Sequence, residues 1–238
     1  MQLDEPPSLS PATPVSFRRD ASVPDRVFLA LFVVLALCHL AAAWLALGWV
    51  TAVVTDLVFL GYLAAAAGHH RGRPLIARLL LLGLVAGMLE LATDAAGAQF
   101  AHSLVYPAGE PMLWQSPVYM PISWMVVLTL LGYLGWRLAG RLPLWQAMAL
   151  SALAGMLTVP FYEECAWYAG WWSYTTLPRI GHTPIYVFLF EGAVAMILPL
   201  LTRRIERLSL ARVATLGLVL GGWMPLVAFV SWRLLGQG

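Results

Sequence analysis

The chain contains no lysine, few charges and only two cysteines. All 14 basic residues of the 238-residue sequence are arginine, charged residues make up 11% of it, and the net charge is +2. Because the arginines are dispersed over short segments, we expect no nucleic-acid partner. Cys38 and Cys165 lie far apart, in or beside apolar segments. They indicate neither a disulfide framework nor a metal site.

Motifs for common cofactors and metals are also missing. The sequence has no nucleotide-binding glycine loop, no HExxH and no GxSxG. It has no DDxxD-like run to hold Mg²⁺ and a diphosphate, which disfavours prenyl transfer that starts by ionisation. The histidines lack the repeated spacing of a membrane di-iron oxygenase; they are His39, His69, His70, His102 and His182. We therefore expect neither a cofactor nor a metal.

What the sequence has in abundance is apolar residues. They make up 61% of the chain, and the mean hydropathy is +0.77. A soluble domain of this size could not bury so much apolar surface, so the composition indicates a multi-pass membrane protein. Residues 1–24 carry five prolines without apolar periodicity, which predicts a disordered cytoplasmic tail. Residues 25–238 are expected to form the transmembrane domain.

Seven apolar stretches are long enough to span a bilayer, because a helix needs about 20 residues to cross it. They are 27–47, 50–68, 75–98, 117–137, 144–164, 183–202 and 212–235. Arginines concentrate before the first stretch and in alternate connections, which predicts a cytoplasmic N-terminus and an outer C-terminus. The predicted fold is an all-α integral membrane protein with seven transmembrane helices, and we expect it in a bacterial inner membrane.

Half of the twelve acidic residues interrupt these apolar stretches. They are Asp56, Glu90, Asp94, Glu163, Glu164 and Glu191. An ionisable group inside a membrane costs about 2.5–3.5 kcal/mol even on the insertion scale, so six of them need a reason. The predicted orientation puts all six in the outer halves of four helices. We therefore expect a one-sided cluster of carboxyl groups.

Aromatic residues gather on the same side. Seven of the fourteen residues from Phe161 to Tyr174 are aromatic. An interfacial belt of Trp and Tyr explains single rings but not a one-sided cluster interleaved with carboxyl groups. The connections 99–116 and 165–182 each precede a similar string, "SPVYMPISW" at 116–124 and "TPIYVFLFE" at 183–191. This similarity predicts an internal helix-pair repeat whose two halves face one shared cavity.

The acids and aromatic rings together suggest cation chemistry. Glu90 and Asp94 are four residues apart and share a helix face, so one should stay protonated beside its ionised partner. Glu163 and Glu164 are adjacent and point in different directions, so only one of them need face the cavity. Aromatic faces attract cations by about 0.5–2 kcal/mol each. Such a site suits protonation of an alkene or epoxide and shelter of the carbocation.

Two strings carry a resemblance to known families. "ELATDAAGAQFAHSLVY" (90–106) and "EECAWYAGWWSY" with "GHTPIYVFLFEG" (163–174 and 181–192) resemble the repeated lycopene cyclase domain. The first string is also similar to carotenoid hydratases, and the size and span number resemble integral-membrane meroterpenoid cyclases. These families share cofactor-free, acid-initiated carbocation chemistry on isoprenoid chains. By position, Glu90 and Asp94 match the first acidic motif, Glu164 the second and Glu191 a Pro-x-Glu-like position.

The resemblance implies a terpene or meroterpenoid cyclase of the isomerase or lyase class, acting on a hydrophobic isoprenoid in the bilayer. Asp94 or Glu90 would protonate the substrate, and Glu164 and Glu191 would stabilise charge or remove the last proton. The expected substrate-binding residues are Trp124, Trp167, Trp171, Trp172, Tyr174, Tyr106, Tyr119 and Tyr186.

Other functions stay open at this point. In a carotenoid or isoprenoid hydratase, water instead of an internal alkene would capture the cation. In a proton-coupled transporter or a lipid-binding protein, the same acids would relay protons. The almost apolar inner halves of the spans count against transport. An assembly factor would pair the acids with arginines, but only Arg179 lies in the two long outer connections.

Overall fold

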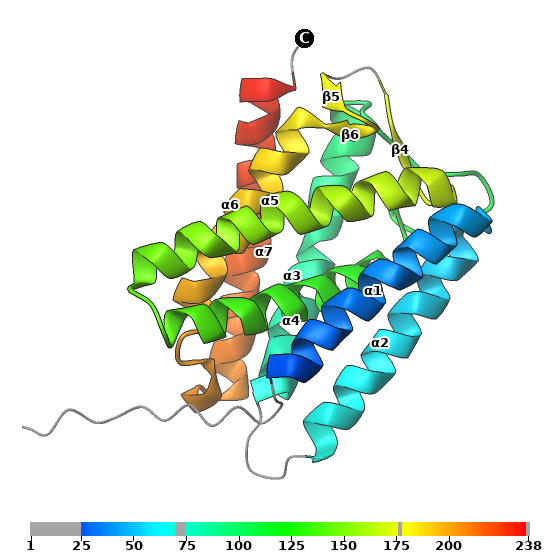
Figure 1. The fold of residues 1–238 in the computed structure, drawn as a ribbon. Coiled ribbons are helices and arrows are strands. Elements are labelled where there is room, and N and C mark those ends of the chain that lie inside the picture. Colours follow the sequence, from blue (N-terminus) through cyan, green and yellow to red (C-terminus); the bar gives the residue numbers. More distant parts are fainter. Residues whose placement is uncertain (1–24, 70–74, 176–177, 237–238) are drawn as a thin grey trace, which may run out of the picture.

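The computed structural model describes residues 25–69, 75–175 and 178–236, and it consists mainly of helices (Figure 1). The seven long helices are α1 (Asp25–Leu45), α2 (Trp49–His69), α3 (Leu75–Ala95), α4 (Met120–Ala139), α5 (Leu144–Ala169), α6 (Ile185–Thr202) and α7 (Leu210–Leu235). All seven are long and apolar enough to cross a membrane. The chain is therefore a multi-pass membrane protein, and the seven predicted spans are confirmed.

Other expectations lie beyond what this structure decides. The predicted disordered tail, residues 1–24, falls outside the described residues. The orientation and the internal repeat stay predictions, because helix length and composition do not tell on which side a terminus lies. We therefore name the two ends of the bundle by their content. The strand end carries the short β-strands, and the arginine end carries Arg137, Arg141 and the start of α1.

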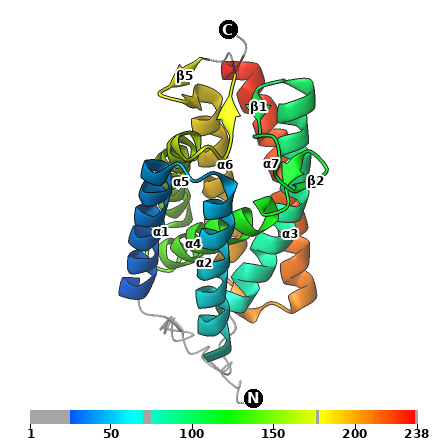
Figure 2. The ribbon, with the colours of Figure 1, turned by 90° about the vertical axis from the view of Figure 1, so that its right-hand side faces the viewer.

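The helices do not form a parallel bundle. α4 and α5 cross α3, α6 and α7 steeply, while α1 and α2 lie along one side (Figures 1 and 2). α3 packs on α4 and α7, α6 packs on α5 and α7, and α1 packs mainly on α5. The resulting core is apolar towards the arginine end. Leu79, Leu82 and Leu198 are fully buried there.

The α3–α4 and α5–α6 connections form the strand end. α3 continues into a π-helical turn, η1 (Ala96–Phe100), before β1 (Leu104–Val105). β1 pairs antiparallel with β4 (Ser173–Tyr174), which ties the two connections together. Two hairpins follow, β2 (Met112–Leu113) with β3 (Ser116–Pro117), and β5 (Arg179–Ile180) with β6 (Thr183–Pro184). A short 3₁₀ turn, η2 (Ile205–Arg207), joins α6 to α7 at the opposite end.

Two glycines let α3 approach α4 closely. Gly83 and Gly87 form a Gly-x-x-x-Gly pattern, the small-residue spacing that brings membrane helices together. A methyl group on Gly87 would lie 2.7 Å from the carbonyl oxygen of Pro121, and one on Gly83 would lie 2.9 Å from that of Met125. This contact sets the position of the last turns of α3, which carry Glu90 and Asp94.

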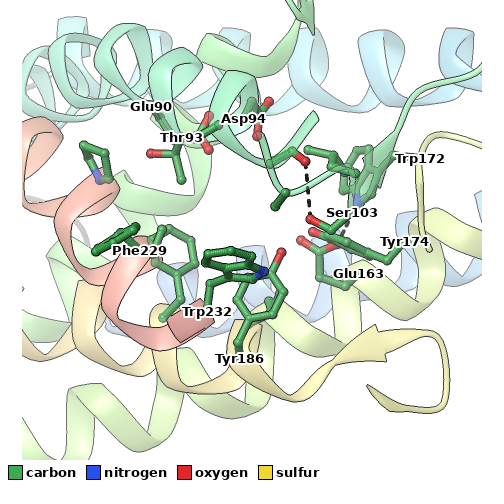
Figure 3. Close-up of a pocket in the computed structure, with 18 of the residues that line it drawn as sticks. Glu90, Thr93, Asp94, Ser103, Glu163, Trp172, Tyr174, Tyr186, Phe229 and Trp232 are labelled. Atoms are coloured by element: carbon green, nitrogen blue, oxygen red, sulfur yellow. Dashed lines mark hydrogen bonds between the residues drawn. The ribbon is translucent and has the colours of Figure 1, made fainter. Parts of the chain in front are cut away.

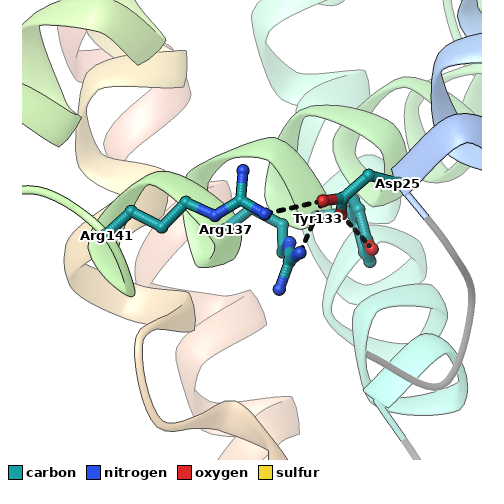
Figure 4. A network of polar contacts seen from close by, with 4 residues as sticks. All are labelled: Asp25, Tyr133, Arg137 and Arg141. Carbon is teal, nitrogen blue, oxygen red and sulfur yellow. Dashed lines mark hydrogen bonds and ion pairs between the residues drawn. The ribbon is translucent and has the colours of Figure 1, made fainter. Parts of the chain in front are cut away.

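A polar network joins α1 to α4 at the arginine end (Figure 4). The Asp25 carboxylate pairs with Arg137 at 2.5 Å and with Arg141 at 2.8 Å, and the Tyr133 hydroxyl donates to it at 3.0 Å. The rings of Phe28 and Tyr133 stack next to it with centroids 3.5 Å apart. The network fixes the start of α1 against the end of α4.

We expect Gly87→Ala to destabilise the protein and Gly61→Ala to leave it nearly unchanged. The new methyl group at Gly87 meets backbone that cannot turn aside, whereas none of the described atoms outside its own helix lies within 4 Å of the Gly61 position. Overpacking of this kind costs about 1–3 kcal/mol. Thermal unfolding of both variants in the same detergent checks the difference. Equal melting temperatures would contradict the α3–α4 contact.

Candidate functional site

A cavity of about 320 Å³ lies between the helices at the strand end (Figure 3). Its walls come from the end of α3, η1, the β1 and β4 connections, and α4, α5, α6 and α7. A cavity of this volume falls at the lower end of the range for small-molecule sites. Figure 3 shows side chains from α3 on one side and from α6 and α7 on the other.

Four carboxyl groups line this cavity. Glu90 and Asp94 come from α3, Glu163 from α5 and Glu191 from α6. Glu90 and Glu191 are each 2% exposed. The Glu90 and Asp94 side chains lie within hydrogen-bonding reach of each other. Two negative charges so close repel strongly where water is scarce, so this arrangement favours a proton on one of the two carboxyl groups.

Each end of the cavity's acid cluster is held by an aromatic donor. The Tyr106 hydroxyl donates to Asp94 Oδ2 at 2.5 Å, and Trp172 Nε1 donates to Glu163 Oε2 at 2.6 Å. Tyr174 also lies within reach of Glu163. Burial, with the charges of Asp94 and Glu90, raises the pKa of Tyr106 well above its usual value. Tyr106 therefore remains a neutral donor at physiological pH.

The remaining walls are mostly aromatic and apolar. The rings are Tyr106, Trp124, Trp172, Tyr174, Tyr186, Phe190, Phe229 and Trp232. Among the described lining residues none is Arg or His. Aromatic faces beside carboxyl groups favour a cation and disfavour an anion. The site is thus suited to positive charge.

Three buried polar atoms of lining residues are without a partner among the described residues. Glu90 Oε2, Thr93 Oγ1 and Trp232 Nε1 are buried and lack a hydrogen-bond partner within the part of the chain that the structure describes. All three residues line the cavity. A buried polar atom without a partner costs about 1–3 kcal/mol, so these three atoms point to a ligand with a polar group.

Glu164 lies outside this cavity, contrary to the expectation. Its carboxylate accepts from the His182 backbone N–H at 2.8 Å and lies 2.7 Å from His182 Nδ1. The reason is helix geometry, since adjacent residues point about 100° apart. The α5 acid in the cavity is Glu163, and Glu164 instead fastens the β5–β6 hairpin.

The predicted aromatic residues divide in the same way. Trp124, Trp172, Tyr174, Tyr106 and Tyr186 line the cavity as expected. Three others do not, and they are Trp167, Trp171 and Tyr119. The ring of Trp167 stacks on His182 with centroids 3.5 Å apart, Trp171 Nε1 donates to Gly48 O at 3.0 Å, and the Tyr119 hydroxyl donates to Glu110 Oε2 at 3.3 Å.

A second, smaller cavity of about 70 Å³ adjoins the first. Met120, Trp124, Glu163 and Trp172 line both. Asp56 of α2 faces this second space and accepts a short hydrogen bond from Ser123 of α4. Asp56 therefore lies beside the acid cluster but behind a wall of aromatic rings.

The comparison with protein families now bears on this site. Residues 91–235, more than half of the chain, match the family described as a domain of unknown function, DUF6989. The chain is a member of the DUF6989 family. The matched part includes Asp94, Glu163 and Glu191, whereas α1, α2 and Glu90 precede it.

The chain was also compared with curated proteins and with solved structures. No curated protein and no solved structure matches the chain. Nothing links this DUF6989 protein to the lycopene cyclase or terpenoid cyclase families, so that resemblance stays a prediction.

Within the described residues of the DUF6989 protein, no group of three or more His, Cys, Asp or Glu side chains is arranged to hold a metal ion. The four cavity acids are spread around the wall instead of converging on one point. What they can do together is donate, accept and hold protons.

Sequence reasoning overlooked several lining residues. Thr93 lies next to Asp94 and three residues after Glu90, a spacing that put it on the same helix face. Phe229 and Trp232 lie on α7, where apolar rings are what any lipid-facing helix presents. Glu110, which lines neither of the two cavities, was also missed, because it lies in a connection outside the apolar stretches.

Glu110 should make the stability of the protein depend on pH. It is 7% exposed, and burial raises its pKa to about 7 from 4.5, against a smaller opposing effect of its hydrogen bond from Tyr119. The folded state then binds the proton more tightly, so this contribution is largest below pH 4.5 and is lost as the pH rises towards 7. The change amounts to roughly 3 kcal/mol.

Thermal unfolding of the wild type and of Glu110→Gln between pH 4.5 and 7.5 tests this expectation. The neutral amide of Gln cannot lose a proton, so the variant should lack the part of the pH-dependence that Glu110 causes. Parallel curves for the two proteins would contradict a buried, protonated Glu110.

Proposed function

We propose that this protein is a membrane-embedded cyclase that closes rings on a prenyl or isoprenoid chain by acid-initiated carbocation chemistry, without a cofactor. One observation carries the proposal. Four carboxyl groups from three helices, Glu90, Asp94, Glu163 and Glu191, face one aromatic-walled cavity without a basic side chain among its described lining residues. The sequence of residues 90–106 and 163–192, from which we expect a resemblance to carbocation-forming enzymes, agrees with this proposal.

The Glu90–Asp94 pair is the proposed acid. The carboxyl group of the pair that is protonated transfers its proton to the less substituted carbon of the terminal alkene, whose π electrons form the new C–H bond. The positive charge then lies on the neighbouring carbon, and the pair becomes more negative. Tyr106 holds Asp94 with its hydroxyl at 2.5 Å, which orients the acid and stabilises the charge left behind.

Glu163 and Glu191 complete the reaction on the other walls. An internal alkene attacks the cation and forms a ring bond, which moves the positive charge along the chain towards the aromatic faces. A carboxylate then removes a proton from the adjacent carbon, and a new alkene forms. One proton is used and one is returned, so substrate and product are isomers. Glu163 takes the role that the sequence assigned to Glu164.

The cavity also suggests the chemical class of the substrate. Four carboxyl groups repel a diphosphate, and none of the described lining residues is a basic side chain that could bind one. A neutral hydrogen-bonding group fits the unpartnered Glu90 Oε2 and Thr93 Oγ1 better. The proposed substrate is therefore a linear isoprenoid with a neutral polar group, such as an alcohol, a phenol or an epoxide.

A reaction chamber suits the bundle better than a transport path. Towards the arginine end the core is packed with side chains that are fully buried, among them Leu79, Leu82 and Leu198. A proton-coupled transporter needs polar groups through the whole thickness of the membrane. Each of the two long connections contains one β-hairpin, and the β1–β4 pair joins the connections. As part of this proposal, this similarity supports an internal repeat in which the α3–α4 and α5–α6 helix pairs face one site.

Neighbouring glutamates provide a matched test of the catalytic assignment. We expect Glu163→Gln to reduce turnover of the substrate by about 10²–10⁴-fold, the usual contribution of a positioned acid or base. Glu164→Gln should remain near wild type, because its side chain faces His182 and not the cavity. Membranes that contain each variant are assayed with a panel of linear prenyl alcohols, prenylated phenols and epoxides, and products are identified by mass spectrometry.

Asp94→Asn extends the same assay to the acid. It should be at least as damaging as Glu163→Gln, because the amide keeps the shape but can neither supply a proton nor carry the negative charge that remains on the Glu90–Asp94 pair. Full turnover in both Asp94→Asn and Glu163→Gln would contradict the proposed function.

Trp124 should control whether water captures the cation. Its ring lies in the wall shared by the two cavities. We expect Trp124→Ala to join them, admit water beside Glu163 and raise the share of hydroxylated product relative to cyclised product. Trp145→Ala is the control, because Trp145 is 70% exposed and lines neither cavity. Reactions in ¹⁸O-water label the hydroxylated product and so give the ratio of hydroxylated to cyclised product. An unchanged ratio in a Trp124→Ala variant that retains turnover would contradict the role of Trp124.

A further inference from the structure

The main cavity has an exposed edge, and that edge faces sideways. Among the described lining residues, those that are exposed are Ala96 and Phe100 of η1 and Phe229 of α7. Phe100 is 81% exposed and Phe229 is 60% exposed. Both lie in segments long and apolar enough to span the membrane, Leu75–Phe100 and Leu210–Leu235. The edge of the cavity therefore lies between two membrane helices.

Away from the strand end, α3 packs closely against α7. Gly217 and Gly221 of α7 form a second Gly-x-x-x-Gly pattern that lies directly on α3. A methyl group on Gly217 would lie 2.8 Å from Val85 Cβ, and one on Gly221 would lie 2.7 Å from Leu89 Cβ. The two helices are thus in close contact up to Gly221.

Beyond that point both helices change. Pro225 interrupts the hydrogen-bond ladder of α7, and α3 passes into the π-helical turn η1. Small side chains, Ala96, Gly97 and Ala228, line the cavity between them. Beyond the tight packing, two helix irregularities and small residues form the exposed edge of the cavity, with Phe100 and Phe229 beside it.

The strand end of the cavity is covered by paired segments. The β1–β4 pair lies at the strand end of the cavity, where Leu104 is 9% exposed and Ser103 is 1% exposed. Thr175 adds two hydrogen bonds to this cover, from its backbone N–H to Ser103 O at 2.9 Å and from its hydroxyl to His102 O at 2.6 Å. The exposed part of the cavity wall is therefore the aromatic edge with Phe100 and Phe229.

We propose that the cavity receives an apolar chain directly from the bilayer, through the opening between η1 and α7. The chain slides between Phe100 and Phe229, and its polar group reaches the unpartnered Glu90 Oε2 and Thr93 Oγ1 inside. The identity of this chain as an isoprenoid rests on the proposed function. The route itself rests on the edge, the helix packing and the cover over the strand end.

Photolabelling in liposomes tests the route without requiring turnover. The full-length protein is reconstituted with a farnesol analogue that carries a diazirine and dissolves in the bilayer, and adducts are mapped by mass spectrometry. We expect adducts on Glu90, Phe100, Phe229 and Trp232. A membrane-impermeant, water-soluble diazirine should leave Glu90 unlabelled.

Two alanines one helical turn apart on α3 and η1 provide the matched variants. Ala96 lines the opening, whereas Ala92 is exposed but does not line the cavity. Ala96→Phe should fill the opening and lower the rate of Glu90 labelling about tenfold, equivalent to a barrier change of about 1.4 kcal/mol. Ala92→Phe should label like the wild type, which shows that added bulk at the lipid surface is not sufficient.

The outcomes separate this route from the cyclase assignment. Labelling of Glu90 by the soluble probe, unchanged labelling in Ala96→Phe, or no adduct in the cavity of the wild-type protein would overturn the route. If Ala96→Phe blocks labelling but the wild type converts none of the prenyl panel, the route stands and the cyclase proposal fails. If the protein cyclises a substrate and Ala96→Phe labels normally, the route fails alone.

Discussion

The structure depends on keeping several carboxyl groups inside a helical bundle where water is scarce. An isolated charge in such surroundings is costly, so each acid needs a hydrogen-bond donor, a shared proton or a ligand. Asp94 has the Tyr106 hydroxyl, Glu163 has the Trp172 indole, and Asp56 has Ser123. Glu90 lies beside Asp94 on α3, and its Oε2 has no partner among the described residues. The strand end of the fold supplies these donors.

The unusual connections follow from this need. Tyr106 and Trp172 lie in or beside the segments that form β1 and β4, and the pairing of these two strands holds both donors over the ends of α3 and α5. A simple turn between helices would leave the acids without partners. The close α3–α4 contact at Gly87 then sets where Glu90 and Asp94 lie relative to Trp124. The packing of the helices and the pairing of the two connections thus both determine where the carboxyl groups of the cavity lie.

The two ends of the bundle differ in how tightly their helices pack. Apolar packing closes the arginine end, whereas the π-helical turn η1 and Pro225 loosen the contact between α3 and α7 near the acids. Irregular helix geometry costs hydrogen bonds inside a membrane and persists where it lines a cavity. In this DUF6989 protein the irregularities lie at the edge of the acid-lined cavity, which connects the chemistry of the site to the bilayer that surrounds it.

Much of this molecule could be read from the sequence, because hydrophobic stretches of about 20 residues have few alternatives to a spanning helix. The seven helices, the gathering of Glu90, Asp94 and Glu191 and five of the eight aromatic residues followed from that pattern. The choice between Glu163 and Glu164 did not, since adjacent residues on a helix differ by about 100° and only packing decides which one faces inward. Likewise, lipid-facing and cavity-facing rings look the same in a sequence. The partners of Trp167, Trp171 and Tyr119, and the place of Phe229 at the exposed edge of the cavity, were decided by tertiary contacts between segments far apart in the chain.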